Sequence, residues 1–409
     1  MHIFLINHYA GSRSMGMEYR PWYLGREWVA GGHKVTILAA TYAHVRQVQP
    51  QVNNDFSEQQ IDGLTYVWLK TPGYSGNGPG RFLNMITFSR KLKKYAKRIA
   101  DTYHPDIVIA SSTYTWDNYG ARKIAKLANA KYLYEVHDLW PLSPKELGNM
   151  SKYHPFIFSL QKAENFAYRN ADAVISMLPN TLEHMKKHGL APEKWHYVPN
   201  GIKADEWAIE QPGKHAITEM IESLKSEGLF LVGYTGSIGI ANALDNLISA
   251  AYQLKYEQVR FIIVGDGPEK MRLIQWVKKQ NLHNVIFADP VPKDVIPEVL
   301  EIMDILYIGL QRQPLFRFGI SPNKLLDYMM AGRPVIQAID AGNDMVGDAD
   351  CGISIKAEDP DILANTILEL KALPNEKRNE LGANGRKYVI KNHEYGLLAK
   401  KMIDIFSAL

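Results

Sequence analysis

Residues 318–336 read FGISPNKLLDYMMAGRPVI, which combines the start and stop signals of one helix with the start of a strand. Ser321 suits the N-cap position, and Pro322 suits the first helical position, where its missing N–H costs nothing. Gly332 can adopt the left-handed conformation that ends a helix, and the proline that follows prevents continuation. This stretch therefore predicts a short helix over residues 322–331 that leads into a buried strand.

The predicted helix has two chemically different faces. Its apolar face contains Leu325, Leu326, Met329 and Met330. Its polar face contains Asn323, Lys324 and Asp327. A helix N-terminus has free N–H groups and a partial positive charge, so it suits a phosphate. Lys324 adds a full charge for the same anion, and Asp327 can accept hydrogen bonds from ribose hydroxyls. The alternative is an ordinary capped surface helix.

Composition restricts the class of protein. A chain of 409 residues is long for one core, so we expect two domains, and 46% hydrophobic with 22% charged residues is typical of a soluble globular protein. There is no apolar run of membrane-spanning length, and the N-terminus does not resemble a signal peptide. The single Cys351 excludes an internal disulfide framework. A net charge of +4 is too weak to indicate nucleic acid, so we expect a cytoplasmic protein without a nucleic-acid partner.

The N-terminal half begins with a strand–loop–helix–strand pattern over residues 2–7, 8–16, 19–30 and 33–40, which predicts a parallel sheet with a ligand at the carboxyl ends of its strands. The loop contains Gly11, Ser12 and Gly16. It lacks the GxGxxG pattern, and no acidic residue ends the second strand, so a nicotinamide enzyme is disfavoured.

A histidine and an aspartate follow the strand predicted over residues 131–136. Doubly wound folds place their ligands at this position, which makes His137 and Asp138 candidate site residues. A structural histidine is the alternative for His137.

The segment Arg81–Ala100 has a strongly basic helical face next to an apolar start. This pattern fits either a solvated helix face or a peripheral contact with an anionic membrane on its inner, cytoplasmic side.

A second alternation of strands and helices fills the C-terminal half. Its first strand enters a loop with Gly236, Ser237 and Gly239, and its second ends at Gly265-Asp266-Gly267. Glycines between a strand and a helix let backbone approach a diphosphate. We therefore predict two doubly wound α/β domains. Their bounds are 1–201 for the first domain, 202–228 for a linker, 229–390 for the second domain and 391–409 for a last helix that packs back toward the first domain.

The ordered motifs resemble the retaining glycosyltransferases of family 4, which have the GT-B fold. The matching pieces are residues 11–16, His137-Asp138, Asn200-Gly201, YTGSIG at 234–239, VGDGP at 264–268 and SPNKLLDYMMAGRPVI at 321–336. SPNKLLDYM together with DLWP looks most like bacterial transferases that build O-antigen or capsule repeats, including fucosamine transferases.

The resemblance implies a nucleotide-sugar donor, with UDP-sugar expected, on the C-terminal domain and a saccharide or polyprenyl-diphosphate-linked acceptor on the N-terminal domain. The ribose-binding glutamate of the family falls on Asp327, and its second glutamate falls on Gly319. Contacts with the sugar are then expected from the backbone N–H groups of Gly319, Ile320 and Ser321, or from another segment of the chain. The family's diphosphate arginine falls on Ser237, so Lys324 and, second, Arg312 are the candidate replacements.

The implied reaction is sugar transfer with retained anomeric configuration. Amides and a cation stabilise the leaving diphosphate without a metal or other cofactor. No carboxylate is nominated as a nucleophile, and Asp348-Ala349-Asp350 is interpreted as a turn rather than a metal site. His137 is expected to contact hydroxyls near the reacting centre. A sugar-nucleotide 2-epimerase on the same fold and a catalytically silent nucleotide-sugar-binding scaffold are the two alternatives.

Overall fold

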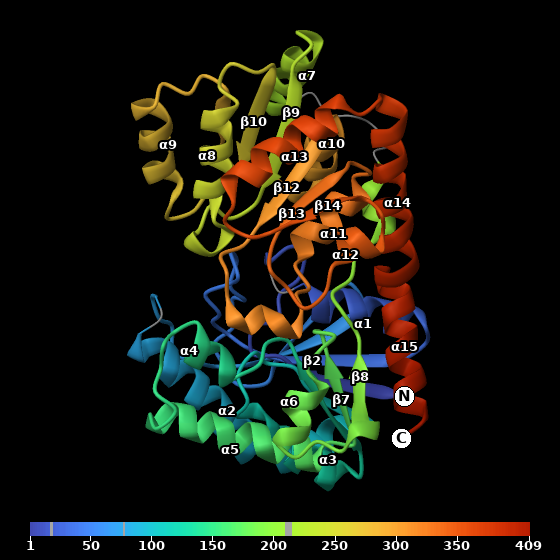
Figure 1. The fold of residues 1–409 in the computed structure, drawn as a ribbon. Helices are drawn as coiled ribbons and strands as arrows, with labels where there is room; N and C mark the ends of the chain where they lie inside the picture. Colours follow the sequence, from blue (N-terminus) through green and yellow to red (C-terminus); the bar gives the residue numbers. More distant parts are fainter. Residues whose placement is uncertain (17–18, 77, 209–214) are drawn as a thin grey trace. The chain divides into compact units, whose positions relative to one another are not determined.

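The computed structural model describes residues 1–16, 19–76, 78–208 and 215–409, and these form two compact units (Figure 1). The N-terminal unit consists of Met1–Asn200 together with Tyr395–Leu409, and the C-terminal unit consists of Gly201–Glu394. Each unit has one mainly parallel sheet, as the alternating strands and helices predicted.

The N-terminal unit contains an eight-stranded sheet in the order β3-β4-β2-β1-β5-β6-β7-β8. Its strands are β1 (His2–Ile6), β2 (Lys34–Ala40), β3 (Ser57–Ile61), β4 (Leu64–Leu69), β5 (Ile107–Ala110), β6 (Lys131–Val136), β7 (Ala173–Ser176) and β8 (Trp195–Tyr197). Only β3 and β4 are antiparallel; the other neighbouring strands run parallel. Strand order reverses between β1 and β5, so the carboxyl ends of β1, β5 and β6 meet at the edge where such folds bind ligands.

Helices cover the N-terminal sheet on both faces, which is why its central strands are almost entirely apolar. They are α1 (Arg20–Ala30), α2 (Pro79–Tyr103), α3 (Asp117–Ala128), α4 (Leu142–Glu146), α5 (Pro155–Asn170) and α6 (Leu182–Lys187), with a 3₁₀ turn at Pro192–Lys194. Helix α3 packs between α2 and α5.

The final helix of the chain, α15 (Tyr395–Ser407), belongs to the N-terminal unit and packs along α1 (Figure 1). The indole N–H of Trp28 donates to the carbonyl of Ala399 at 3.2 Å, and the rings of Tyr23 and Tyr395 stack with centroids 4.5 Å apart. The expected single helix over 391–409 is wrong. The chain is extended at Glu394, so residues 391–393 complete the preceding helix α14 (Asn375–His393) in the other unit.

The C-terminal unit contains a six-stranded, all-parallel sheet in the order β11-β10-β9-β12-β13-β14. The strands are β9 (Phe230–Thr235), β10 (Val259–Val264), β11 (Val285–Ala288), β12 (Ile305–Gly309), β13 (Val335–Ala338) and β14 (Gly352–Ile355). Its helices besides α14 are α7 (Ala216–Ser226), α8 (Leu244–Gln253), α9 (Lys270–Lys279), α10 (Ile296–Ile302), α11 (Asn323–Met330), α12 (Met345–Asp348) and α13 (Pro360–Ala372).

Alternate residues of the C-terminal strands enter two separate cores, because successive side chains of a strand point to opposite faces. Leu231 and Ile262 lie in the core covered by α10 and α11, whereas Val232 and Phe261 lie in the core covered by α8, α9 and α13. This layered packing fixes α11 against the sheet.

The expected linker over 202–228 is wrong for the part that the structure describes; residues 209–214 lie outside the described residues. The 3₁₀ turn Ala204–Trp207 and helix α7 belong to the C-terminal unit. Trp207 and Ile221 are buried in its core, and α7 packs against α10. The apolar side chains of this polar-looking segment therefore integrate it into the C-terminal unit, which begins at Gly201.

Candidate functional site: a cation at the start of α11 and a buried polar network at the end of β6

Helix α11 carries the predicted anion-binding lysine, but it starts one residue later than expected. Pro322 is extended (φ −76°, ψ 128°) and is itself the N-cap, without a side-chain hydrogen bond. The prediction that Ser321 caps the helix is therefore wrong. Because the extended proline delays the first helical residue to Asn323, the free N–H groups of the first turn belong to Asn323 and Lys324. The predicted apolar face is confirmed, since Leu325, Leu326, Met329 and Met330 are all buried.

Lys324 is held against the end of β9. Its Nζ donates to the Tyr234 hydroxyl at 2.7 Å and to the Asn242 amide oxygen at 3.0 Å, and it lies 4.1 Å from the centre of the Tyr234 ring. Among the described residues no carboxylate pairs with it, and burial lowers the pKa of Lys324 to about 7. An ammonium group has three N–H donors, so one is left for a ligand.

Glycine loops at the ends of β9 and β10 lie beside this lysine. Gly236 has φ +127°, and a Cβ there would lie 2.9 Å from Cε of Lys324. Gly265 has φ +151°, and a Cβ there would collide with the carbonyl oxygen of Gly236. The Ile238 N–H donates to the Asp266 carbonyl at 2.8 Å, which joins the two loops. Only glycine permits this close packing of backbone.

The loop before α11 uses its own backbone N–H groups internally. Gly319 has φ +94°, and its N–H donates to the Phe316 carbonyl at 2.9 Å. The Ile320 N–H donates to Oδ1 of Asn343 at 2.8 Å, and the Asn343 amide donates back to the Ile320 carbonyl at 3.1 Å. The N–H groups of Gly319 and Ile320 are therefore both paired within the loop, and their contact with the sugar stays a prediction. Ser321 is partly exposed next to them.

Asp327 lies one turn beyond Lys324 on the same helix and is partly exposed. No described side chain donates a hydrogen bond to its carboxylate. Burial raises the pKa of Asp327 to about 7; Lys293 counteracts this shift and Glu206 adds to it. The carboxylate is thus available to accept hydrogen bonds from a ligand hydroxyl.

The remaining donor-side candidates have mainly structural contacts. The Ser237 carbonyl accepts from the Tyr234 hydroxyl at 2.5 Å, and Asp266 Oδ1 accepts from the Gly267 N–H at 2.8 Å. Gly239 precedes the 3₁₀ turn Ile240–Asn242 that supplies Asn242 to Lys324. Arg312 forms an ion pair with Asp340 at 3.1 Å and donates to the Ala357 carbonyl at 2.7 Å, so its guanidinium is held by residues beside β13 and β14.

In the N-terminal unit, His137 sits on a buried network at the ends of β5 and β6. Glu135 accepts from Arg20 at 2.9 Å through one oxygen and from the Ser111 hydroxyl at 2.6 Å through the other. His137 Nε2 lies 2.9 Å from the Ser111 hydroxyl oxygen and 3.2 Å from Glu135. Because the single hydroxyl hydrogen of Ser111 goes to Glu135, Nε2 of His137 carries a proton and donates, which fixes the orientation of the ring.

The electrostatic balance of this network favours an ionised Glu135. Burial raises the pKa of Glu135, but Arg20, His137 and Ser111 together outweigh burial and hold it well below its usual range. The guanidinium of Arg20 also donates to the carbonyls of Val198 and Pro199, so it links the start of α1 to the end of β8.

The first loop of the N-terminal unit is held mainly by internal hydrogen bonds. The Gly11 carbonyl accepts from the Tyr66 hydroxyl at 2.6 Å, and the buried Ser12 hydroxyl lies 3.0 Å from that of Ser14. Gly16 has φ +75° beside Gln47. Asp138, in contrast, is exposed next to His137.

Sequence reasoning missed several residues that hold these sites. In the N-terminal unit they are Arg20, Ser111 and Glu135, and in the C-terminal unit Tyr234, Asn242 and Asn343. A charged glutamate inside the otherwise apolar strand KYLYEV was the available signal for Glu135, since an unpaired buried carboxylate is very costly. The other residues come from segments distant in sequence and carry no such signal.

Two Rossmann-like units, with a cation and glycine loops at the strand ends of the second, form the architecture of the GT-B fold. The structure is similar to sucrose-phosphate synthase from Thermosynechococcus elongatus, with a TM-score of 0.75 at 17% identity, covering 100% of this chain and 99% of that one. It is also similar to Anabaena Alr3699/HepE solved with UDP and glucose, with a TM-score of 0.69 at 16% identity and 99% coverage of both chains.

Family comparisons agree with the fold. Residues 15–206 match Glycosyltransferase Family 4, and residues 217–388 match Glycosyl transferases group 1. The putative colanic acid biosynthesis glycosyl transferase WcaI of Escherichia coli is 24% identical over 324 residues, which cover 75% of each chain. The probable glycosyltransferase WbjE of Pseudomonas aeruginosa is 23% identical over 274 residues, or 63% of this chain and 66% of that protein. The two models together span most of the chain, which is therefore a family-4-like glycosyltransferase, and the predicted resemblance is confirmed at this level.

In the parts of the chain that the structure describes, no helix is both long and apolar enough to cross a membrane.

Proposed function

We propose that this protein is a retaining glycosyltransferase that moves a sugar, an amino sugar in the first instance, from a UDP-sugar to a saccharide or lipid-linked acceptor during synthesis of a bacterial surface polysaccharide. Relatives named for colanic acid and teichuronic acid biosynthesis support the polysaccharide assignment. The HepE structures with UDP and UDP-glucose support the donor class. The observation that carries the proposal is the half-buried cation Lys324 beside the Gly236 loop, which has no carboxylate partner among the described residues.

Lys324 has the properties of a ligand for the donor diphosphate. Two of its N–H donors are used by Tyr234 and Asn242, which fix the ammonium group in place before the ligand arrives. The third donor and the free N–H groups at the start of α11 supply positive charge to the phosphates. Gly236 has no side chain, so backbone and phosphate can approach closely. Asp327 then accepts hydrogen bonds from the ribose hydroxyls.

The chemical step follows from this charge distribution. The bond between the anomeric carbon and the diphosphate oxygen breaks, and Lys324 with the α11 amides stabilises the negative charge on the leaving group. The acceptor hydroxyl oxygen bonds to the anomeric carbon on the same face, and its proton passes to the leaving phosphate. Glu135 is unsuited as a nucleophile, because both of its oxygens are occupied by Arg20 and Ser111. This transfer uses no metal or other cofactor.

His137 is proposed as the acceptor-side or sugar-contacting group. Its Nε2–H is directed to Ser111 and Glu135, which holds the imidazole in one orientation at the carboxyl ends of β5 and β6, where such folds bind ligands. Glu135 acts on the reaction only through His137, as a positioning residue.

A lipid-linked acceptor fits the surface of α2. The helix exposes Arg90, Lys93, Lys94, Lys97 and Arg98, and near its start exposes Phe82 and Leu83. An apolar pocket is lined by Phe82, Met85, Trp140, Met150 and Phe156. Basic residues next to exposed apolar ones suit an anionic bilayer. Vesicles with anionic lipid should co-sediment wild type but not Lys93→Glu/Lys94→Glu, and zwitterionic vesicles should retain neither. Equal retention of both proteins on anionic vesicles would remove the membrane assignment.

The donor assignment is tested by a thermal-shift panel of UDP, GDP, ADP and dTDP. A ligand that binds only the native state raises the melting temperature by mass action. We expect UDP to stabilise wild type and to lose most of this effect with Lys324→Met. No shift with any nucleotide at millimolar concentration contradicts the proposed donor site and favours the silent scaffold. NMR of the product separates retention at the anomeric centre from inversion, and epimerised UDP-sugar formed without an acceptor supports the epimerase.

A further inference from the structure

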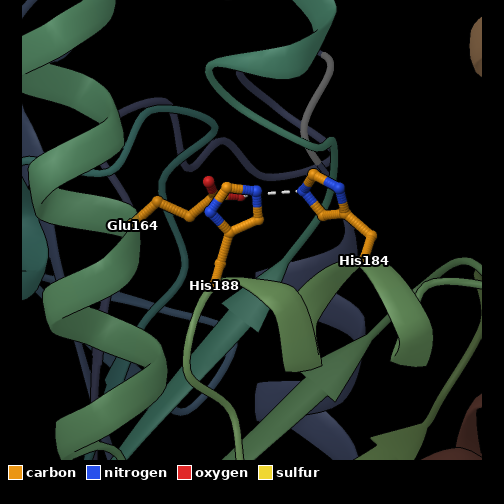
Figure 2. A group of neighbouring side chains, drawn as sticks. All are labelled: Glu164, His184 and His188. Carbon is orange, nitrogen blue, oxygen red and sulfur yellow. Dashed lines mark ion pairs between the residues drawn. The ribbon is translucent and has the colours of Figure 1, made fainter.

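Helices α5 and α6 of the N-terminal unit bring together three side chains that the proposed sugar transfer does not use. Glu164 lies on the buried face of α5, His184 lies on α6, and His188 is the C-cap residue of α6. One potential ligand atom of each lies within 4.8 Å of the other two. Figure 2 shows the three side chains converging, with a dashed line that marks the ion pair between Glu164 and His184.

The spacing of this cluster is close to that of a tetrahedral metal centre. Zinc bonds of about 2.0–2.2 Å place neighbouring ligand atoms roughly 3.4 Å apart. Oε1 of Glu164 and Nε2 of His184 are already 3.5 Å apart. His184 and His188 are four residues apart, which puts both on one side of α6, and their ring centroids are 4.6 Å apart. A shift of roughly 1–1.5 Å in the widest pair would complete the geometry.

The hydrogen bonds around His188 leave its Nε2 without a proton. The Gln161 side-chain nitrogen donates to Glu164 at 2.6 Å and to Asn165 Oδ1 at 2.9 Å, which uses both of its hydrogens. Its nitrogen must face Glu164, because an amide oxygen there would meet a carboxylate. Nδ1 of His188 lies 2.9 Å from the same Gln161 nitrogen and 3.0 Å from Asn165 Oδ1. Since the Gln161 hydrogens go to the two oxygens, Nδ1 carries the proton and donates it to Asn165. Metal-binding histidines are commonly oriented in this way, because one ring nitrogen donates to a neighbouring acceptor and the other binds the metal.

Glu164 is also held in place from the side away from the histidines. It is 1% exposed, and it accepts from the Tyr168 hydroxyl at 3.1 Å as well as from Gln161. Each carboxylate oxygen can accept a second contact, so these bonds leave room for a cation. The positive charges of Lys145 and Lys187 act on His188 and oppose a cation, while the buried carboxylate favours one.

We propose that Glu164, His184 and His188 bind one divalent transition-metal ion, with zinc as the best match, and that the ion fastens α5 to α6. Two nitrogens and one oxygen suit zinc, whereas magnesium and calcium prefer oxygen ligands alone. Water completes the fourth position. The site is structural, so it does not depend on the proposed sugar transfer.

The test uses the full-length protein after treatment with EDTA and dialysis. We expect titration calorimetry to show one saturable zinc site, cobalt to give the visible spectrum of a tetrahedral complex, and zinc to raise the melting temperature. Glu164→Gln keeps the size of the side chain and should weaken zinc binding more than tenfold, as should His188→Gln. Asn165→Ala should weaken it about 10- to 100-fold, because Asn165 orients His188.

His283→Gln is the matched control, since His283 is exposed in the other unit, and it should bind zinc like wild type. Glu164→Gln provides a folded comparison if a histidine variant fails to fold. Zinc binding of equal strength in wild type and Glu164→Gln would overturn the proposal, as would the absence of saturable binding in wild type. The cluster would then be a hydrogen-bonded ion pair only.

Discussion

Replacing Lys324 by methionine is the sharpest test of the donor site. Methionine has a similar length and no charge, so it occupies the space beside Gly236 while removing the donor to the diphosphate. The Tyr234 hydroxyl and the Asn242 amide oxygen each lose one hydrogen bond from Lys324. The Tyr234 hydroxyl keeps its hydrogen bond to the Ser237 carbonyl.

The size of the effect follows from the chemistry of this lysine. A hydrogen bond to a charged group contributes about 1.5–3 kcal/mol, which corresponds to roughly a 10- to 150-fold change in affinity. With a pKa of about 7, Lys324 is charged in half of the free protein molecules near that pH. This reduces the wild-type affinity by only about twofold. We therefore expect UDP to bind Lys324→Met about 10- to 100-fold more weakly.

Titration calorimetry of UDP into wild type and variant near pH 7 measures this difference. Arg312→Met is the matched control: it removes a cation that Asp340 and Ala357 already hold, and UDP affinity should change by less than about threefold. The ligand-free Lys324→Met protein should melt close to wild type, because it loses a buried charge along with its hydrogen bonds. UDP binding by Lys324→Met within about threefold of wild type would refute the reasoning.

Three further predictions concern pH, backbone packing and the buried ion pair. UDP affinity should be greatest near pH 7, because Lys324 loses its charge above its pKa of about 7 and Asp327 becomes neutral below its own pKa of about 7. In calorimetry across pH, the affinity of Lys324→Met should no longer fall at alkaline pH, and that of Asp327→Asn should no longer fall at acid pH. Gly265→Ala should abolish the UDP-induced thermal shift, because the new Cβ forces the two glycine loops apart; an unchanged shift would contradict the packing argument. Glu135→Gln should lower the free energy of unfolding by about 3 kcal/mol, because it leaves Arg20 buried without its carboxylate. The pKa of Glu135 is lowered in the folded state, so the difference in the free energy of unfolding between wild type and Glu135→Gln is present above the unfolded-state pKa of about 4.3 and declines as the pH falls below it. Denaturation at two pH values checks this decline.

The layered fold was predictable because its signals are local. Short apolar strands alternate with helices, and in α11 the apolar residues keep helical spacing, so both the sheet and the buried face of this helix follow from the sequence. The placement of Lys324 at a helix start next to a glycine loop followed from capping residues and from the motif order. These features depend on neighbours within a few positions.

The parts that were missed depend on pairs distant in sequence. Tyr234 and Asn242 meet Lys324 across 90 and 82 residues, and Asn343 reaches the Ile320 backbone across 23. The internal hydrogen bonds of the loop at Gly319 were likewise invisible, because a glycine predicts backbone freedom but not the partner of its N–H. The predicted N-cap of α11 was wrong because Ser321 and Pro322 both favour the start of a helix. Only the observed ψ of Pro322 shows that the proline is the N-cap.

The chain crosses between the two units twice, after Asn200 and after Glu394. The C-terminal unit is therefore an insertion in the sequence of the N-terminal one. Trp28 and Tyr23 stay exposed on the ribosome until residues 395–409 emerge, because their partners Ala399 and Tyr395 are made only after the inserted unit. Domains usually fold in the order of their synthesis. Here the second unit can finish folding first, and the first unit acquires α15 only after the inserted unit has been made.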